Sequence, residues 1–270
     1  MGDGLLELSG LLRQLRVLFS VLWSPSLLMK RQSIAELLDT DSGTPSEIAA
    51  TFADLRLINR RFGGFTTTET MIRRVAQASG CKSLSLLEVA AGSGHMPKAI
   101  QHRMLARGIH LQVSLLDRVW SHLHDGGNGN SGPTNGFRAV AGDALALPFR
   151  DESFDLVSCN LFAHHLSSEQ TVQFVNEALR TCRIAVLVND LVRHRLHLAL
   201  VYVSLPLFRS RITWHDAPAS VRQAYTLHEM HNLFEQTDAS QVEIRKRYLF
   251  RMGVIAWKNA CRSQKDTCTT

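Results

Sequence analysis

A glycine-rich turn lies between an apolar run and a helical pattern in the segment LLEVAAGSGHMPKAI (86–100). Gly92 and Gly94 let the backbone turn tightly and approach a ligand with no side chain in between. A helix that follows such a turn directs free N–H groups and the positive end of its dipole at the ligand. Pro97 fits the first turn of that helix, because no hydrogen bond is lost there. The segment predicts a site for a nucleotide-like ligand, although a GxG turn alone is weak evidence.

Two carboxylates are expected at the same edge of a sheet as this turn. Asp117 closes the apolar run HLQVSLLD (110–117), and Asp143 closes FRAVAGD (137–143). Asp117 could accept hydrogen bonds from both hydroxyls of a ribose, although an Asp that caps the following turn is an equally good interpretation. Asp143 could accept from an adenine amino group while the N–H of Ala144 pairs with the ring. Together these positions favour a ligand that contains adenosine.

The elements that must position these groups follow from the apolar pattern. Short apolar runs typical of strands buried on both faces occur at 83–90, 110–117, 137–143, 153–160 and 183–190. Helical patterns lie between them at 96–107 and 168–181. The segments QVEIRKRYLF and MGVIAWKN predict a C-terminal antiparallel pair. The alternation indicates right-handed βαβ units and a doubly wound α/β sheet.

Helices are also predicted before the sheet, at 5–23, from Pro45 to the Gly63–Gly64 pair, and at 66–79 with Thr67 or Thr68 as the cap.

Composition excludes several classes of protein. The 270 residues are 45% hydrophobic, which is enough for a full core, and the net charge of +6 comes from scattered basic residues typical of solvated surface. The five cysteines form no metal-type CxxC pair and no signal peptide precedes them, so we expect a cytoplasmic protein with reduced thiols and no metal. The longest apolar run, Leu196–Phe208, has 13 residues, fewer than the roughly 20 that span a membrane.

The combined motifs resemble one enzyme family. Pro97 replaces the third glycine of a dinucleotide-binding GxGxxG, which favours a single adenosine over NAD. EVAAGSG, LLD, GDALALPF and SFDLVSCN together resemble the class I S-adenosylmethionine-dependent methyltransferases, over roughly residues 55–258. The resemblance implies a seven-stranded Rossmann-like sheet whose last strand is antiparallel, in agreement with the C-terminal pattern.

The same resemblance implies a binding site for S-adenosylmethionine. It would be formed by Glu88, Ala90 and Gly92 at the methionine portion, Asp117 at the ribose, Asp143 with Ala144 at the adenine, and Asn160 beside the sulfonium. Arg60 could reach the cofactor carboxylate, although plain surface charge is an equally good interpretation. The Gly/Asn-rich loop 125–136 departs from the family pattern.

The acceptor class also follows from resemblance. NLFAHHL (160–166) resembles the ubiquinone-biosynthesis type, and LRLINRRFGG (55–64) resembles bacterial small-molecule methyltransferases found near type III polyketide synthases. The (D/N)PP(Y/F) motif of nucleic-acid amine methyltransferases is absent, because that position reads CNLF. We therefore expect a small, apolar, phenolic or quinol-like acceptor and no nucleic-acid partner.

Two histidines are candidates for catalysis. A base is needed only if the acceptor arrives protonated, since methyl transfer mainly requires positioning of the reactants. His165 is the first candidate because it lies just beyond the fourth strand and histidine titrates near neutral pH, although its ring could merely pack over the cofactor. His215 could pair with Asp216 only if the chain turns these neighbours toward each other.

The resemblance divides the chain into an N-terminal helical segment or cap (1–80) and a methyltransferase domain (81–270) with a lid insertion at about 191–225. The run 196–208 would form this lid, or else an ordinary core helix, and its lack of a polar face predicts that it is covered on most sides. An apolar lid would imply a hydrophobic acceptor, and transient membrane contact would then suit the N-terminal helix. The alternatives are an NAD(P)-dependent oxidoreductase and a non-catalytic partner subunit that binds S-adenosylmethionine.

Overall fold

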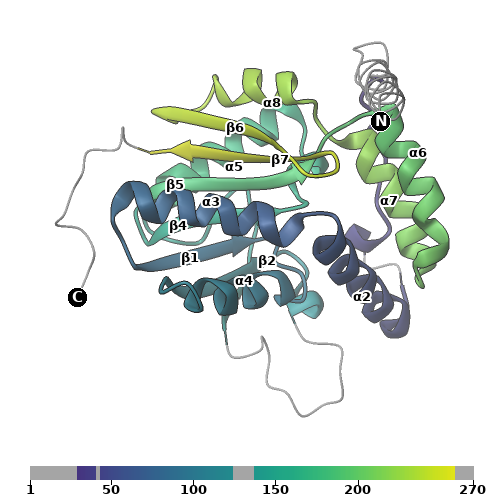
Figure 1. Cartoon of the computed structure of the whole chain (residues 1–270), viewed down its shortest axis with the longest axis horizontal. Helices are drawn as coiled ribbons and strands as arrows, with labels where there is room; N and C mark the ends of the chain where they lie inside the picture. The colour runs from purple at the N-terminus through teal and green to yellow at the C-terminus, as the bar shows by residue number, and fades with distance from the viewer. Residues whose placement is uncertain (1–28, 41–42, 124–136, 259–270) are drawn as a thin grey trace, which may run out of the picture.

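The computed structural model describes residues 29–40, 43–123 and 137–258 (Figure 1). The helix predicted at 5–23 and the Gly/Asn-rich loop 125–136 lie outside the described residues. Cys81 takes part in a disulfide bond, whereas Cys159 and Cys182 are free. The expectation that all thiols are reduced is therefore wrong for Cys81.

Seven strands form one sheet in the order β3-β2-β1-β4-β5-β7-β6. Their bounds are β1 Ser83–Val89, β2 His110–Asp117, β3 Arg138–Ala141, β4 Phe154–Asn160, β5 Cys182–Leu191, β6 Gln241–Arg247 and β7 Arg251–Trp257. β7 pairs antiparallel with both β5 and β6, whereas the pairs among β1 to β5 are parallel. The predicted seven-stranded sheet with an antiparallel last strand is confirmed.

The helices are α2 Pro45–Arg61, α3 Gly64–Ser79, α4 His95–Leu105, α5 Ser168–Thr181, α6 Arg195–Ser204, α7 Arg211–Gln223 and α8 Leu227–Phe234. The described residues also form four short 3₁₀ turns: η2 Leu38–Thr40, η3 Trp120–Leu123, η5 Ala163–His165 and η6 Leu205–Leu207.

One predicted helix cap is wrong. α3 begins at Gly64 after Gly63, whose φ of 77° makes the sharp turn from α2, so Thr67 and Thr68 are buried inside the helix and do not cap it.

The two faces of the sheet carry separate helical layers. Leu84 and Leu86 of β1 belong to the core under α3 and α4, while Leu87 and Val89 of the same strand belong to the core under α5 and α8. This division explains the continuous apolar runs, because a strand covered on both sides has no polar face. Figure 1 shows α3 crossing one face of the sheet and α8 lying beside β6.

A third group of helices lies at one end of the sheet. Figure 1 shows α2, α6 and α7 packed together there, beyond the tips of the strands. The sequence predicted that the run 196–208 is covered by protein or by a ligand, and in α6 the protein leaves 43% of Leu200 and 78% of Val203 exposed. No helix in the described part of the chain is both long and apolar enough to cross a membrane.

Candidate functional site

A cavity of about 840 Å³ lies between the sheet and the α2–α6–α7 group, in the size range of small-molecule sites. One half is bounded by the glycine turn after β1 and by the ends of β2, β3 and β4. The other half is bounded by α2, η5, α6, η6 and α7. The cavity therefore joins two halves. The first is the half that the sequence predicted to bind a nucleotide-like ligand, and the second is mostly apolar.

The glycine turn is built from residues with left-handed backbone. Ala90, Gly92 and Gly94 have φ values of 54°, 51° and 67°. A Cβ at Gly92 would come within 3.0 Å of the Phe52 ring, which lines the cavity. A larger residue at Gly92 would therefore be strained and would crowd the space that the turn leaves for a ligand.

Asp117 fixes this turn through its carboxylate. Its Oδ2 accepts a hydrogen bond from Gly92 N at 2.7 Å, and its Oδ1 accepts from Val119 N at 2.9 Å. The side chain is buried and lines the cavity. The bond to Val119 matches the capping interpretation. Each carboxylate oxygen has a second lone pair, so the same group can also accept from ribose hydroxyls.

Asp143 and Ala144 lie on the same wall of the cavity. Asp143 Oδ1 accepts from Leu145 N at 2.9 Å, so the loop after β3 holds this carboxylate in place. Asp143 is exposed and Ala144 is buried. A carboxylate beside a buried backbone suits the recognition of an adenine edge.

Glu88 lies at the base of the cavity in a fully buried position. Burial raises the pKa of its carboxyl to about 7, although the Ser158 hydroxyl, which donates to the carboxylate, acts in the opposite direction. A cationic ligand beside Glu88 would favour its ionised form. Glu88 can therefore respond to the charge of whatever binds in the cavity.

Asn160 lies where the two halves meet, beside a buried arginine. Arg251 Nη2 donates to Asn59 Oδ1 at 2.8 Å and Nη1 donates to Asn189 Oδ1 at 3.0 Å, with a longer contact of 3.4 Å to Asn160. Burial lowers the pKa of Arg251 to about 10. These acceptors are neutral, so the cavity wall carries a cation that an anionic ligand group could neutralise.

The predicted Arg60 is exposed and does not line the cavity, whereas Arg56, one helical turn earlier on α2, does. The helical period of 3.6 residues alone could have indicated Arg56 as the alternative. Nothing in the sequence pattern marked Arg251, because it reads as an ordinary strand residue.

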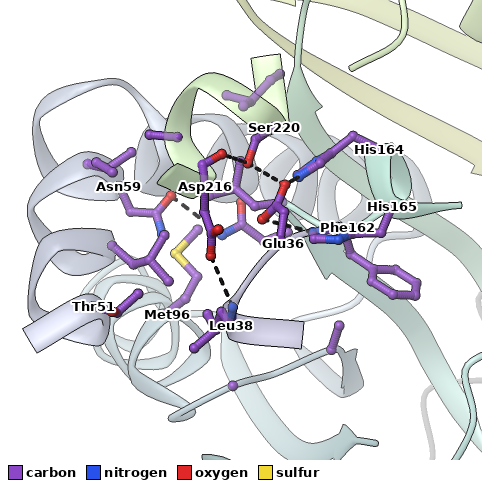
Figure 2. Close-up of a pocket in the computed structure, with 18 of the residues that line it drawn as sticks. Glu36, Leu38, Thr51, Asn59, Met96, Phe162, His164, His165, Asp216 and Ser220 are labelled. Carbon is purple, nitrogen blue, oxygen red and sulfur yellow. Dashed lines mark hydrogen bonds and ion pairs between the residues drawn. The ribbon is translucent and has the colours of Figure 1, made fainter. Parts of the chain in front are cut away.

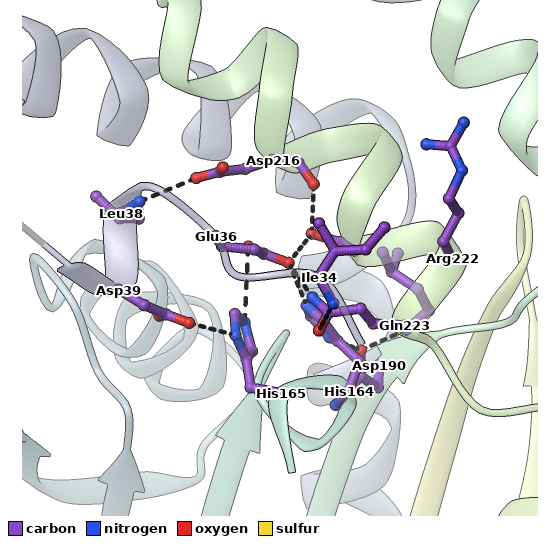
Figure 3. Close-up of polar contacts among 12 residues, drawn as sticks. Ile34, Glu36, Leu38, Asp39, His164, His165, Asp190, Asp216, Arg222 and Gln223 are labelled. Atoms are coloured by element: carbon purple, nitrogen blue, oxygen red, sulfur yellow. Dashed lines mark hydrogen bonds and ion pairs between the residues drawn. The ribbon is translucent and has the colours of Figure 1, made fainter. Parts of the chain in front are cut away.

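Five acidic and imidazole side chains meet at the far wall of the cavity (Figure 3). His164 Nδ1 lies 2.7 Å from Asp190 Oδ1, and His165 Nδ1 lies 2.7 Å from Asp39 Oδ2. The Nε2 atoms of the two histidines face Glu36, at 3.5 Å from Oε1 and 3.8 Å from Oε2. Burial alone would lower the pKa of His164, but the Asp190 and Glu36 carboxylates outweigh it and raise the pKa to about 10.

Glu36 is carried by residues 29–37, which we call the strap. Asp216 accepts from Leu37 N at 2.9 Å and from Leu38 N at 3.1 Å, which fixes the end of the strap to α7. Arg31 donates to the backbone carbonyls of His164 and Leu166. Ser220 Oγ then donates to Glu36 Oε1 at 2.7 Å, as Figure 2 shows. The strap therefore closes the cavity wall with a residue far from the histidines in sequence.

The two candidate catalytic histidines are placed differently. His165 lines the cavity, whereas His215 is exposed and does not. His215 does pair with its neighbour, since its Nδ1 lies 2.8 Å from Asp216 Oδ1. Asp216 itself lines the cavity. Its carboxylate accepts hydrogen bonds from the backbone of the strap and so holds the strap in place.

The chain is similar to known methyltransferases in sequence over one segment and in fold over most of its length. The family model described as "Methyltransferase domain" matches residues 87–185. A SAM-dependent methyltransferase from Aquifex aeolicus has a TM-score of 0.54 at 14% identity, and the match covers 80% of this chain and 100% of that chain. The plantazolicin methyltransferase BpumL, solved with a desmethylPZN analog and SAH, has a TM-score of 0.58 at 13% identity, covering 80% and 96%. No curated protein sequence matches the chain significantly.

Proposed function

We propose that this chain, which has a class I methyltransferase fold and carries the methyltransferase domain over residues 87–185, methylates a small apolar acceptor with S-adenosylmethionine. We expect the acceptor to be phenolic or quinol-like. The observation that carries the proposal is the single cavity with two unlike halves, which meet at Asn160.

The polar half suits the cofactor. Its wall holds the positive-φ glycine turn, the Asp117 carboxylate that braces it, and Asp143 with Ala144 on the neighbouring loop. In our proposal Glu88, Ala90 and Gly92 hold the methionine portion, and the carboxylates take the ribose and the adenine amino group. Arg56 replaces Arg60 as the candidate partner for the cofactor carboxylate. S-adenosylmethionine would supply the electrophilic methyl group at the meeting point of the two halves.

The second half suits an apolar acceptor. Its wall includes Leu55, Phe162, Val201, Leu207 and Phe208. An apolar lining excludes water and favours a hydrophobic ring, while a few polar groups orient it. We propose that α6 and η6 act as a lid over this half. Their exposed apolar side chains would be covered when an acceptor binds.

His165 is the proposed group for accepting the phenolic proton. With its Nδ1 at 2.7 Å from Asp39, the Nδ1–H tautomer is favoured and Nε2 is left as the acceptor. The phenol oxygen would attack the methyl carbon from the side opposite the sulfonium, so positioning of the two reactants does most of the catalysis.

The test is transfer of a deuterated methyl group. Purified protein is incubated with S-adenosylmethionine labelled in the methyl group and with a panel of alkylphenols, catechols and quinols, and the products are analysed by mass spectrometry. We expect one acceptor class to gain the labelled methyl. Binding of S-adenosylmethionine without transfer to any acceptor would instead support the non-catalytic partner subunit.

A further inference from the structure

Two imidazoles and one carboxylate converge on the cavity wall. We call Glu36, His164 and His165 the Glu36 cluster. Their ligand-type atoms all lie within 4.8 Å of one another. The two Nε2 atoms face the two oxygens of Glu36 at 3.5 and 3.8 Å, as the contacts in Figure 3 show. The three side chains thus surround one point from three sides.

The other nitrogen of each histidine is already held by a carboxylate. Asp190 lies 2.7 Å from Nδ1 of His164, and Asp39 lies 2.7 Å from Nδ1 of His165. A carboxylate on Nδ1 holds the proton at that nitrogen, so a metal ion that displaces the proton from Nε2 would meet a lone pair directed at the cluster. Metal-ligating histidines are held in this way by their outer partners.

The Nε2 of His164 is a second observation that points to a ligand at the cluster. This side chain is 2% exposed, and its Nε2 has no hydrogen-bond partner. Buried polar atoms are almost always satisfied, so an unpartnered one calls for an explanation. Here Nε2 faces Glu36 Oε1 at 3.5 Å, which is within the range of an ion pair but too long for a good hydrogen bond, and this separation also suits two ligands of one ion.

The charges around the cluster favour a cation. Glu36, Asp39 and Asp190 bring three carboxylates to two imidazoles. Arg31 is close to this region, but its guanidinium donates to the backbone carbonyls of His164 and Leu166 and to none of the three carboxylates. Arg118 and Arg251 interact electrostatically with Asp39 and Asp190, and a divalent ion that displaced the His164 proton would supply positive charge beside Glu36.

We propose that Glu36, His164 and His165 bind a divalent first-row transition-metal ion through Glu36 and the two Nε2 atoms, with Asp190 and Asp39 as outer partners. Two imidazoles and a carboxylate suit such ions, including Zn²⁺ and Fe²⁺. Ligand bonds of about 2.0–2.1 Å at tetrahedral angles place ligand atoms roughly 3.4 Å apart. The two histidine–Glu36 separations of 3.5 and 3.8 Å are close to this value, and all three ligand atoms lie within 4.8 Å of one another.

Three protein ligands leave coordination positions open toward the cavity. An oxygen of water or of a hydroxylated ligand could complete the shell. Metal binding is independent of methyl transfer. Its use in activating an acceptor hydroxyl rests on the proposed function, and His165 would then act as a ligand and the ion would assist deprotonation.

The test begins with the untagged wild-type chain. It is stripped with a chelator, dialysed and titrated with Zn²⁺ by calorimetry, and the bound metal is counted by mass spectrometry. Co²⁺ is loaded in parallel, because its visible absorption reports the ligand geometry. We expect one ion per chain at a site with nitrogen and oxygen ligands. Wild-type protein that retains no stoichiometric ion would overturn the proposal.

Variants then locate the site, since the chain has 12 histidines. Glu36→Gln and His165→Ala should each weaken Zn²⁺ binding at least roughly tenfold, as losses around metal sites do. His231→Ala is the matched control, because His231 is an exposed histidine with its own carboxylate partner, Glu235 at 3.3 Å. Wild-type affinity in both cluster variants would contradict the assignment.

Two further measurements, thermal melting and S-adenosylhomocysteine binding, distinguish an unfolded variant from a wrong assignment of the metal site. Thermal melting of the metal-free variants shows whether they fold, and the wild-type Co²⁺ spectrum tests the ligand set even if a variant does not. S-adenosylhomocysteine binding is measured on the same preparations. Wild-type protein that binds S-adenosylhomocysteine but takes up no metal ion would refute the metal site while leaving the methyltransferase proposal intact.

Discussion

Glu88 is a buried carboxyl whose folded-state pKa of about 7 lies above the ordinary value of 4.5. The folded protein therefore holds this proton more tightly than the unfolded chain does. The resulting stability is fully present below about pH 4.5 and is lost as the pH rises through 7. The total loss once the pH is well above 7 is on the order of 3 kcal/mol, from the size of the shift.

Glu88→Gln removes this titration while keeping an acceptor for the Ser158 hydroxyl. We expect the variant to melt at a higher temperature than wild type at pH 8 and at a similar temperature at pH 4.5. Glu235→Gln, at an exposed position, serves as the control and should match wild type at both values. A variant that melts at a lower temperature than wild type at pH 8 would contradict the raised pKa of Glu88.

Asp117 both braces the glycine turn and faces the proposed ribose site. Asp117→Ala leaves Gly92 N and Val119 N without their carboxylate acceptor. We expect S-adenosylmethionine affinity to fall roughly 30- to 150-fold, equivalent to about 2–3 kcal/mol for hydrogen bonds to a charged group. The melting temperature of the ligand-free protein should also fall.

Asp143→Ala is the comparison for Asp117→Ala, because Asp143 is exposed. It should weaken binding without lowering the melting temperature. Calorimetry and thermal melting separate the two effects. If Asp117→Ala binds S-adenosylmethionine with unchanged affinity, Asp117 acts only as a structural cap.

At the residue scale, the sequence indicated the polar half of the cavity but missed the far wall. Gly92, Asp117 and Asp143 follow strands, and the ends of parallel strands meet at one edge of a sheet. Glu36 could not be found in this way, because hydrogen bonds from α7 and η5 place the strap. Long-range packing of this kind leaves no local pattern.

The α6 helix is the element for which one of two alternatives remains, because the protein does not cover it but a ligand could. A run without a polar face predicted a covered element, yet Leu200 and Val203 are exposed at the cavity rim. The pattern of apolar residues in a sequence shows which side chains favour burial, but it does not show whether protein or a ligand covers them.

We expect Val203→Ser to lower turnover of an apolar acceptor at least tenfold. Val203 lines the cavity and is largely exposed, so the change removes apolar contact with the acceptor and disturbs little of the core. S-adenosylmethionine affinity and melting temperature should stay close to wild type. Ala199→Ser, an exposed position on the same helix that does not line the cavity, is the control. A melting-temperature loss of several degrees in Val203→Ser would assign α6 a core role instead.

The strands and most helices were predictable because their signals are local. Apolar runs identified the five parallel strands, and Pro45 marked the first turn of α2. The start of α3 was misplaced because the tertiary turn at Gly63 overrides the capping preference of threonine. The sheet order follows from right-handed crossovers, but the packing of α2, α6 and α7 does not.

On the scale of the whole molecule, the chain joins two recognition surfaces in one cavity. The sheet edge supplies polar groups for an adenosine-containing cofactor, and the helical group supplies an apolar compartment. Asn160 and Arg251 lie between them. Neither part forms the cavity alone. The residues on the acceptor side could therefore not be identified from the sequence.

The most direct test of this account is calorimetry on the purified chain with three ligands, namely S-adenosylmethionine, S-adenosylhomocysteine and NADH. The polar half has carboxylates for one adenosine, and Pro97 replaces the third glycine of a dinucleotide turn. We predict one site per chain with micromolar affinity for the first two ligands and no measurable heat with NADH. Tight NADH binding without a signal from S-adenosylmethionine would contradict the account.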